Sequence, residues 1–422
     1  MKILIVSTFF PPKNSIASLR PYSWAKWWSK AGHDVTVLTT LKKTSESDLN
    51  LDCSFFRVIS TKQKETISSK ISSAKSSSFS FKKMILSLLK NLFSDYLASK
   101  GCFVSCRFPD WHDSWAKKSV SNVIDEKWDL VISTGWPYSV HRVGYALKKN
   151  NPSVKWIVDW RDLWTMNHLY EGFFLFRWYE KLLEKKFHRN ADMITTVSEP
   201  LAETLRAMTS TPVVTITNGF DEDDFIDIVR KPRKLNKKFT IVYSGTIFKG
   251  FRDPAPLFKA VKNLISKNII SKNDLRIIFA GTKNTDMTDT AKEYGISDYF
   301  FYAGFLPREE ILKMQYDADA LLFLEYNDPN VKGVLTGKLF EYLYLAREIW
   351  AVGIESDSSA GSIIADMNAG ECFGNDILKI QEYIVKVLKN KNVRKKNQKI
   401  LSRFNRKNLA LSLLDSLKKV SI

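Results

Sequence analysis

The sequence predicts an α/β protein made of two doubly wound, Rossmann-like domains, each built on a parallel sheet. Three observations lead to this prediction: the length of 422 residues, an alternation of short strand patterns with helical patterns, and a charged break near the middle. A single hydrophobic core stops growing at about 250–300 residues, so two domains are expected. Strand–helix–strand alternation is typical of parallel sheets that helices cover on both faces.

The strand patterns of the first half are β-branched and apolar runs bounded by Gly, Pro, Asn or Asp. We expect strands at 3–6, 35–38, 130–132, 156–158, 193–197 and 213–217, with a helix at 19–31. The stretch 229–238 is charged, contains a proline and lacks apolar periodicity, which favours a linker. The first domain is therefore predicted at 1–228.

The second half repeats the alternation. Strand patterns occur at 239–243, 275–279, 300–302, 320–324 and 349–352, and helical patterns separate them at 254–267, 309–317 and 336–346. We expect a second domain at 239–403, and a last helix at about 404–422 that packs back on the first domain. Two such domains place a cleft between the carboxyl-end loops of their sheets, where these sheets bind ligands.

The composition excludes several classes of protein. With 44% hydrophobic and 26% charged residues, the chain is neither disordered nor fibrous. Its 4 cysteines form no CxxC pair, which argues against a disulfide-stapled secreted protein and against a structural zinc site. No apolar run approaches the roughly 20 residues that cross a bilayer, and the opening is too short for a signal peptide. We expect a soluble intracellular protein.

The net charge of +19 is concentrated in two segments, 53–100 with a balance of +7 and 379–419 with +11. Such segments suit an anionic partner, either membrane phosphates or nucleic acid, although solvated helix faces explain them equally well. Residues 81–97 follow the helical apolar template behind the serine-rich stretch 68–80, as a basic membrane-interface helix does. The alternative is a helix packed on the first domain or on a second subunit.

Nucleic acid is the less favoured partner, because its binding surfaces interleave basic residues with exposed aromatic ones. The basic C-terminal segment contains only Tyr383 and Phe404. We therefore expect an anionic membrane surface to bind 81–97 and the basic C-terminal region, and no nucleic acid to bind.

Loops after predicted strands of the first half carry residues suited to sugars. Residues 133–139 lead to His141, and residues 159–164 place Asp159, Arg161 and Asp162 beside two tryptophans. Aromatic faces, carboxylates and guanidinium groups are what sugar rings contact. The alternative for such an acidic and basic cluster is a structural ion-pair network.

In the second half, the predicted strand 239–243 is followed by Gly245, Thr246, Lys249 and Arg252. Small residues let the backbone approach a ligand closely, and the two cations suit a diphosphate. The acidic run 221–224 is interpreted as a solvated loop.

A helix predicted to begin near Thr336 carries Lys338 and Glu341 three residues apart on one face. Its positive dipole end favours phosphate. A weak surface salt bridge between the two side chains is the alternative.

The sequence argues against several classes of enzyme. The sequence contains no GxxxxGK[ST], HExxH, GxSxG or kinase signature, and its 5 histidines lack metal-ligand spacing. We expect no metal and no cofactor.

Taken in order, these segments resemble the GT-B type glycosyltransferases, specifically the retaining family 4. The resemblance rests on the Phe-Pro-Pro loop and Arg20 within 1–39, on 191–200 and 216–221, and on TGKLFEYL at 336–343. The last motif is similar to the nucleotide-binding helix of members that build bacterial surface polysaccharides. The stretch from about 41 to 106 is the least family-like.

The resemblance implies a role for each donor-site residue. Glu341 would hold the ribose hydroxyls and Arg252 the diphosphate, while Gly245 and Thr246 would face the phosphates and backbone around Phe305 would meet the base. The family has a second glutamate eight residues before the first, where this chain has Gly333, and a basic residue where it has Thr246. Lys249 or Lys338 would compensate for the missing basic residue.

The expected activity is transfer of a sugar, with retention, from a nucleotide-diphosphate donor to a lipid-linked or growing glycan in cell-surface polysaccharide synthesis, such as lipopolysaccharide or capsule. The donor is expected to be a UDP-sugar. Asp159, Asp162, Trp136 and His141 would orient sugar and acceptor. Such an enzyme would be cytoplasmic and peripheral on the inner face of the cell membrane. The alternatives are a sugar-nucleotide epimerase or hydrolase of the same fold, or a basic membrane- or nucleic-acid-binding protein.

Overall fold

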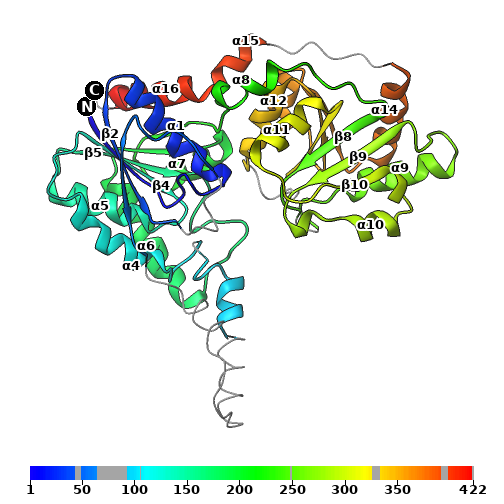
Figure 1. Cartoon of the computed structure of the whole chain (residues 1–422). Helices are drawn as coiled ribbons and strands as arrows, with labels where there is room; N and C mark the ends of the chain where they lie inside the picture. The colour runs from blue at the N-terminus through cyan, green and yellow to red at the C-terminus, as the bar shows by residue number, and fades with distance from the viewer. Residues whose placement is uncertain are drawn as a thin grey trace, which may run out of the picture. The chain divides into compact units, whose positions relative to one another are not determined.

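The computed structural model describes residues 1–42, 49–63, 93–104, 106–247, 250–325, 333–390 and 398–420. The chain forms two compact units (Figure 1). Unit 1 comprises Met1–Ile216 and Ala410–Ile422, and unit 2 comprises Thr217–Leu409. Each unit is an α/β structure with a parallel sheet, as predicted, and each is described here by itself.

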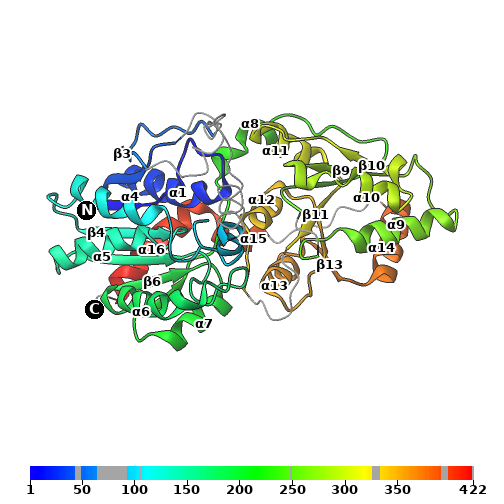
Figure 2. The same cartoon turned by 90° about the horizontal axis from the view of Figure 1, so that it is seen from below.

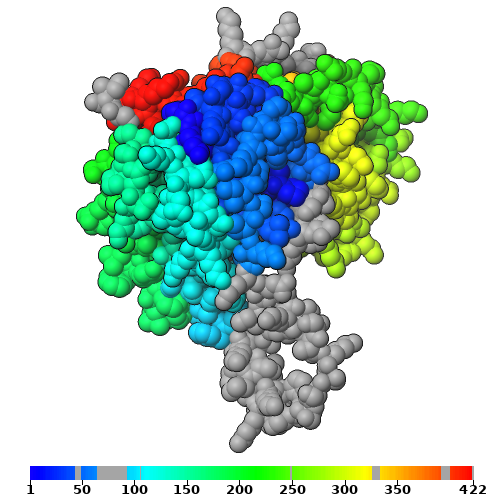
Figure 3. Space-filling model, turned by 60° about the vertical axis from the view of Figure 1, so that its left-hand side comes forward, coloured from blue at the N-terminus to red at the C-terminus, as the bar shows by residue number. Residues whose placement is uncertain are grey.

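The described part of unit 1 contains one seven-stranded sheet in the order β3-β2-β1-β4-β5-β6-β7. Its neighbouring strands are all parallel. The strands are β1 (Lys2–Val6), β2 (Asp34–Thr40), β3 (Arg57–Thr61), β4 (Leu130–Gly135), β5 (Lys155–Trp160), β6 (Met193–Thr196) and β7 (Val213–Thr215). The six strands that the sequence predicts are thus confirmed, and β3 is an additional strand at the edge of the sheet. In Figure 3, strand β3 is part of the surface coloured blue.

Helices cover both faces of this sheet (Figure 2). Helices α4 (His112–Ser119), α5 (Val140–Asn150), α6 (Phe174–Asn190) and α7 (Glu199–Met208) lie on one face. They enclose an aromatic core that includes Trp115, Trp156, Trp160 and Phe187. Helix α1 (Ile16–Lys30) lies on the other face with α16 (Arg406–Val420), where the Trp28 indole donates a hydrogen bond to the Ala410 carbonyl at 2.8 Å. The C-terminal part of α16 therefore packs in unit 1.

Unit 2 contains, among its described residues, a six-stranded parallel sheet in the order β10-β9-β8-β11-β12-β13. The strands are β8 (Phe239–Ser244), β9 (Leu275–Ala280), β10 (Phe300–Tyr302), β11 (Ala320–Leu324), β12 (Glu348–Val352) and β13 (Gly370–Gly374). Five of them are predicted from the sequence, and β13 is not.

One hydrophobic core of unit 2 lies between the sheet and the helices α9 (Ala255–Ser266) and α14 (Ile377–Lys389). The further helices are α8 (Ile226–Val229), α10 (Thr288–Glu293), α11 (Arg308–Asp317), α12 (Gly337–Leu345), α13 (Ser359–Asp366) and α15 (Gln398–Leu401). Helices α11 and α12 follow strands at the carboxyl-end edge of the sheet, and their first residues therefore belong to the loops where ligands bind.

The charged stretch 229–238, which the sequence favours as a linker, belongs to unit 2. Arg233 donates hydrogen bonds to Asp319 Oδ1 at 2.6 Å and to the Ala318 carbonyl at 2.7 Å. The stretch is therefore fastened to the start of β11.

The predicted amphipathic helix 81–97 lies mostly outside the described residues, which resume at Phe93. Residues 93–99 are helical. None of the helices in the described ranges has the length and apolar character needed to span a bilayer.

Candidate functional site

The candidate ligand site of unit 2 begins at Gly245, directly after β8. Its φ of +136° lies in a region that side chains of L-residues rarely adopt. A Cβ atom built at Gly245 would lie 1.7 Å from Lys338 Nζ. The positive φ is the reason that this turn favours glycine, and a side chain at this position would also force the end of Lys338 to move.

Lys338 approaches this turn from the first turn of α12, whose N-cap residue is Thr336. Its Nζ lies 5.1 Å from the centre of the Tyr243 ring. Burial lowers the pKa of Lys338 to about 7, the charge of Arg252 adds to this effect, and Glu341 and Glu325 oppose it. The structure thus brings Lys338 close to Gly245 and within electrostatic reach of Arg252, although Lys338 lies far from both in the sequence.

Glu325 is a member of this site that the sequence analysis missed. It follows β11 directly, is 6% exposed, and its Oε1 accepts a hydrogen bond from the Thr336 amide at 2.9 Å. Burial raises the pKa of Glu325 to about 7, against the hydrogen bonding of Thr336 and the charges of Arg252 and Lys338. Its position directly after the apolar run 320–324 could have identified Glu325 as a site residue, because parallel sheets bind ligands at the carboxyl ends of their strands.

Glu341 lies one turn after Lys338 on α12 and is 4% exposed. Its Oε1 accepts a hydrogen bond from Arg308 Nη2 at 2.8 Å, and the same nitrogen lies 2.9 Å from Asp224 Oδ2. The charges of Glu341 and Asp224 help to raise the pKa of Arg308 above its ordinary value, although burial opposes them. Glu341 is therefore held by an ion pair whose partner the sequence analysis did not identify.

The interpretation of 221–224 as a solvated acidic run holds for Glu222 and Asp223, which are exposed, but it is wrong for Asp221 and Asp224. Asp221 is 3% exposed and caps the short helix 222–224 by accepting a hydrogen bond from the Asp223 amide at 3.3 Å. Asp224 pairs with Arg308 and lies 3.6 Å from Arg406 Nη1. Asp224, which is half-buried, therefore supplies a counter-charge to two arginines that come from distant parts of the chain.

The other predicted donor-site residues lie around this cluster. The Thr246 carbonyl accepts a hydrogen bond from the Tyr243 hydroxyl at 3.0 Å. Phe305 is 61% exposed in the loop after β10, and the neighbouring Gly304 carbonyl accepts a hydrogen bond from the Gly281 amide at 2.9 Å. This bond ties the Phe305 loop to the carboxyl end of β9. Lys249 lies outside the described residues.

In unit 1, Asp159 lies near the end of β5 and is fully buried. Its two oxygens accept hydrogen bonds from Arg20 at 2.8 and 3.2 Å, and from Thr134 and Thr195 at 2.7 Å each. Burial alone would raise the pKa of Asp159, but Arg20 and the two hydroxyl groups outweigh it and hold the pKa below its ordinary value. Asp159 thus belongs to the kind of structural ion-pair network that was the alternative interpretation.

His141 lies in the first turn of α5 and is also fully buried. Its Nδ1 lies 2.8 Å from Ser133 Oγ, and its ring packs against Trp160 with a centroid distance of 4.1 Å. Burial lowers the pKa of His141 to about 3, so the imidazole is neutral at physiological pH. A catalytic role for His141 stays a prediction.

The loops beside these two residues are partly exposed. Arg161 donates hydrogen bonds to the carbonyl groups of Gly135, Ala17 and Trp136, and thereby joins the loops after β4 and β5 to α1. Asp162 and Trp136 are both half-buried. The structure therefore assembles the predicted loops 133–139 and 159–164 at one edge of the sheet.

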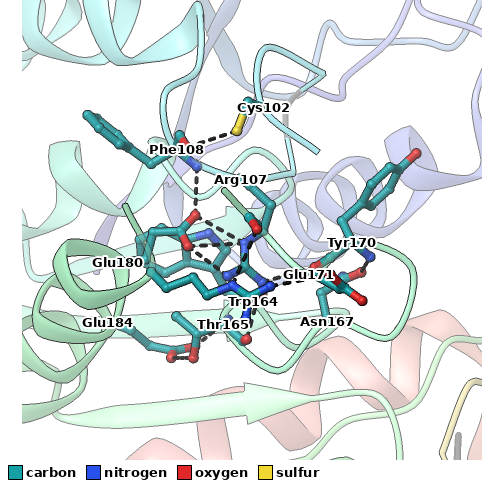
Figure 4. A network of polar contacts seen from close by, with 12 residues as sticks. Cys102, Arg107, Phe108, Trp164, Thr165, Asn167, Tyr170, Glu171, Glu180 and Glu184 are labelled. Atoms are coloured by element: carbon teal, nitrogen blue, oxygen red, sulfur yellow. Dashed lines mark hydrogen bonds and ion pairs between the residues drawn. The ribbon is translucent and has the colours of Figure 1, made fainter. Parts of the chain in front are cut away.

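A buried network of polar contacts, which the sequence analysis did not predict, supports the same edge of the unit 1 sheet (Figure 4). Arg107 is 1% exposed and forms a bidentate ion pair with Glu180 of α6, with an Nη2–Oε2 distance of 2.7 Å. Its Nη1 donates to the carbonyl groups of Trp164, Thr165 and Tyr170. Arg107 thus ties the segment before α4 to α6 and to the loop after β5.

Among the residues that the structure describes, no group of three or more His, Cys, Asp or Glu side chains could hold a metal ion. Arg252 and Lys338 are two cations of unit 2 that could neutralise a diphosphate.

Comparisons with known proteins bear on each half of the chain. Residues 18–219 match the model of the glycosyl transferase 4-like domain, and residues 224–403 match that of glycosyl transferases group 1. A comparison with curated protein sequences found no match.

Solved structures with the same fold cover the chain from end to end. Sucrose-phosphate synthase from Thermosynechococcus elongatus is 14% identical, with a TM-score of 0.57 over 100% of this chain and 99% of that chain. The apo form of the lipopolysaccharide outer core galactosyltransferase WaaB is 10% identical, with a TM-score of 0.59 over 100% of both chains.

A third structure is described as trehalose-6-phosphate from E. coli bound with UDP-2-fluoro glucose. It is 10% identical, with a TM-score of 0.63 over 99% of both chains. Identities this low show the fold, and the two family models that together run through both units show the class of enzyme. The chain belongs to the glycosyltransferases of GT-B architecture.

Proposed function

We propose that this glycosyltransferase moves a sugar, with retention of configuration, from a UDP-sugar to a lipid-linked or growing glycan of a cell-surface polysaccharide. The observation that carries the proposal is the cation pair Arg252 and Lys338 at the Gly245 turn. Two cations beside a glycine backbone suit a diphosphate, since each charge-assisted hydrogen bond contributes about 1.5–3 kcal/mol.

The donor nucleotide would lie across the carboxyl ends of β8, β11 and β10. Lys338 and Arg252 bind the diphosphate, while Glu341, which Arg308 orients, accepts hydrogen bonds from the ribose hydroxyls. The loop around Phe305 meets the base. Two structural relatives support uridine as that base, namely the alpha-glucosyltransferase in complex with UDP and the E. coli structure bound with UDP-2-fluoro glucose.

Glu325 would take the place of the carboxylate that is missing at Gly333. It lies at the end of β11 within the electrostatic reach of both cations. A carboxyl group there accepts hydrogen bonds from the donor sugar hydroxyls when ionised, and donates one when protonated.

The reaction breaks the bond between the anomeric carbon and the diphosphate oxygen, and the electron pair leaves with the diphosphate. The acceptor hydroxyl oxygen forms a bond to the same face of the anomeric carbon, and its proton passes to the departing phosphate oxygen. Lys338 and Arg252 stabilise the charge that develops on this leaving group. No nucleophilic side chain is required by such a front-face reaction.

The acceptor would be recognised by unit 1, through the partly exposed loops 133–139 and 159–164. Asp159 and His141 act there as buried supports, because the first is saturated with donors and the second is neutral. Of the four residues expected to orient sugar and acceptor, Asp162 and Trp136 are therefore the ones that would contact the acceptor. A lipid-linked acceptor places the enzyme on the inner face of the cell membrane, where 81–97 and the basic C-terminal region would meet anionic lipid.

The test is a calorimetric titration of the full chain with UDP-, GDP- and dTDP-glucose, followed by Glu341→Gln. We expect UDP-glucose to bind the wild-type protein and Glu341→Gln to weaken it at least about tenfold, since losing one charged acceptor costs about 1.5–3 kcal/mol. Glu382→Gln, an exposed glutamate of α14, is the matched control and should leave binding unchanged. Equal binding by Glu341→Gln and wild type would contradict the donor-site assignment.

A further inference from the structure

The outward face of α6 in unit 1 exposes large apolar side chains. Leu175 is 63% exposed, Trp178 71% and Leu182 47%, and their spacing of three and four residues places them on one side of the helix. Tryptophan and leucine side chains are mostly buried in folded proteins. An exposed stripe of this kind marks an interaction surface rather than a solvated one.

The stripe continues beyond the helix into the neighbouring segment 93–99. Phe174 is 63% exposed at the start of α6, and Phe93 and Tyr96 are 56% and 46% exposed. The ring of Phe173 contacts both Phe93 and Tyr96, with centroid distances of 6.4 and 6.2 Å. Figure 1 draws helix 93–99, in cyan, and α6 at the same end of unit 1. We call Phe93, Tyr96, Phe174, Leu175, Trp178 and Leu182 the apolar patch.

The charges of α6 are segregated in a way that selects one kind of partner. Every residue of α6 is described, and its two carboxylates both face inward: Glu180 pairs with Arg107, and Glu184 accepts a hydrogen bond from the Thr165 hydroxyl. Burial raises the pKa of Glu184 to about 7, which reduces its negative charge further. The exposed charged residues of the helix are all basic, namely Arg177, Lys181, Lys185, Lys186 and Arg189.

This combination distinguishes a lipid surface from a protein partner. Protein interfaces deplete lysine at their centres, whereas here Lys181, Lys185 and Lys186 are exposed beside and directly after the apolar stripe. Amphipathic helices with Trp, Phe and Leu on one face and Lys or Arg beside them lie in the interface of anionic membranes, with the charged groups near the phosphates. Tyr and Trp side chains suit the boundary between headgroups and acyl chains.

We propose that the apolar patch and the basic residues of α6 form a docking surface for an anionic lipid membrane. The inference deepens the proposed function, because it names the part of unit 1 that meets the membrane. Its centre is α6, which lies outside the two segments that sequence alone favours, and only Phe93 and Tyr96 of the patch belong to the segment 81–97. Docking through α6 would keep unit 1, which we propose binds the acceptor, at the lipid surface.

The test measures co-sedimentation of the full-length protein with vesicles of phosphatidylcholine alone and with a phosphatidylglycerol mixture. The variants are Leu175→Asp with Trp178→Asp, and separately Lys181→Gln with Lys185→Gln. Leu235→Asp with Ile269→Asp is the matched control, since these apolar residues of unit 2 are 82% and 49% exposed. We expect wild type and control to bind phosphatidylglycerol vesicles, and each α6 variant to bind at least about tenfold more weakly.

Several outcomes would overturn the inference. One is binding by the Leu175 and Trp178 variant that equals that of the control. Another is wild-type binding that is the same for both vesicle types and insensitive to salt. A third is an absence of vesicle binding together with self-association that the α6 variants abolish, which would make a second copy of the chain the occupant.

UDP-glucose titration of the same variants separates this inference from the proposed function. Because α6 lies in unit 1 and the donor residues lie in unit 2, the α6 variants should bind UDP-glucose as wild type does. A wild-type protein that binds vesicles through α6 and binds no nucleotide sugar would refute the proposed donor and leave the docking surface standing.

Discussion

The affinity of the donor site for a UDP-sugar should fall as the pH rises through neutrality. Lys338 has a pKa lowered to about 7, and Glu325 has a pKa raised to about 7. At pH 6 the lysine is charged and the glutamic acid is neutral, whereas at pH 8.5 the lysine is neutral and the glutamate is charged. Between these pH values, the two side chains therefore change from net positive to net negative beside the phosphates.

The magnitude follows from what Lys338 donates. Its charge-assisted hydrogen bond contributes about 1.5–3 kcal/mol when the ammonium is present, and about 1.4 kcal/mol is a tenfold change in Kd. We expect the Kd for UDP-glucose to rise about 10- to 100-fold between pH 6 and 8.5. UDP-glucose is the suitable probe because its diphosphate has no ionisation near neutral pH.

Calorimetry provides both the affinity and the proton balance. Binding at pH 8 should take up a proton, because the bound diphosphate favours the charged form of Lys338, and titrations in buffers of different ionisation enthalpy measure that uptake. Lys338→Met should weaken binding at pH 6 and flatten the pH profile. Lys259→Met, on the exposed side of α9, is the control. A wild-type Kd that is constant across this range, or a Lys338→Met profile as steep as that of wild type, would refute the reasoning.

Two further predictions concern single positions in the two units. Gly245→Ala should weaken UDP-glucose binding in calorimetry, since its Cβ would lie 1.7 Å from Lys338 Nζ and the ammonium group would have to move away from the turn. Gly250→Ala also has a positive φ, of +85°, but its Cβ meets nothing within 4 Å, so equal losses in both variants would show that backbone strain and not Lys338 is responsible. Glu180→Ala leaves Arg107 buried without its counter-charge, and the free energy of unfolding of unit 1 in urea should fall by about 3–5 kcal/mol. A loss below about 1 kcal/mol, typical of exposed pairs, would mean that water reaches this pair.

Most of the fold could be predicted because its central strands are buried on both faces. Such strands read as continuous apolar runs, and β1, β5, β8 and β11 are recognisable on that basis. The two strands that sequence analysis missed among the described residues lie at sheet edges. The β3 sequence RVIST is partly exposed, and the β13 sequence GECFG begins and ends with glycine. Edge strands need less apolar surface, so their pattern is weaker.

The candidate site could be predicted in its local parts but not in its ion pairs. Lys338 and Glu341 share a helix, and Gly245 follows a clear strand, so residue type and spacing identify them. The partner of Glu341 is Arg308, which stands 33 positions away at the start of another helix. That pairing depends on the packing of α11 against α12, which no spacing within either helix specifies.

Helix α6 shows why periodicity alone could not identify the docking surface. Its sequence FLFRWYEKLLEKKFHRN carries apolar residues on nearly every side, so no single stripe stands out. Burial separates them: Leu183 and Phe187 face the core, while Leu175 and Trp178 face outward. The inward side also holds Glu180, which is tolerated there because Arg107 neutralises it.

The Arg107–Glu180 ion pair and the outward-facing apolar patch both follow from the orientation of α6. Arg107 comes from the segment that runs from helix 93–99 to α4, and its contacts hold that segment beside the first turns of α6. The same attachment keeps Phe93 and Tyr96 next to Phe173. A buried arginine in the least family-like part of the chain therefore has a role that its sequence context does not suggest, because it fixes which side chains of unit 1 face outward.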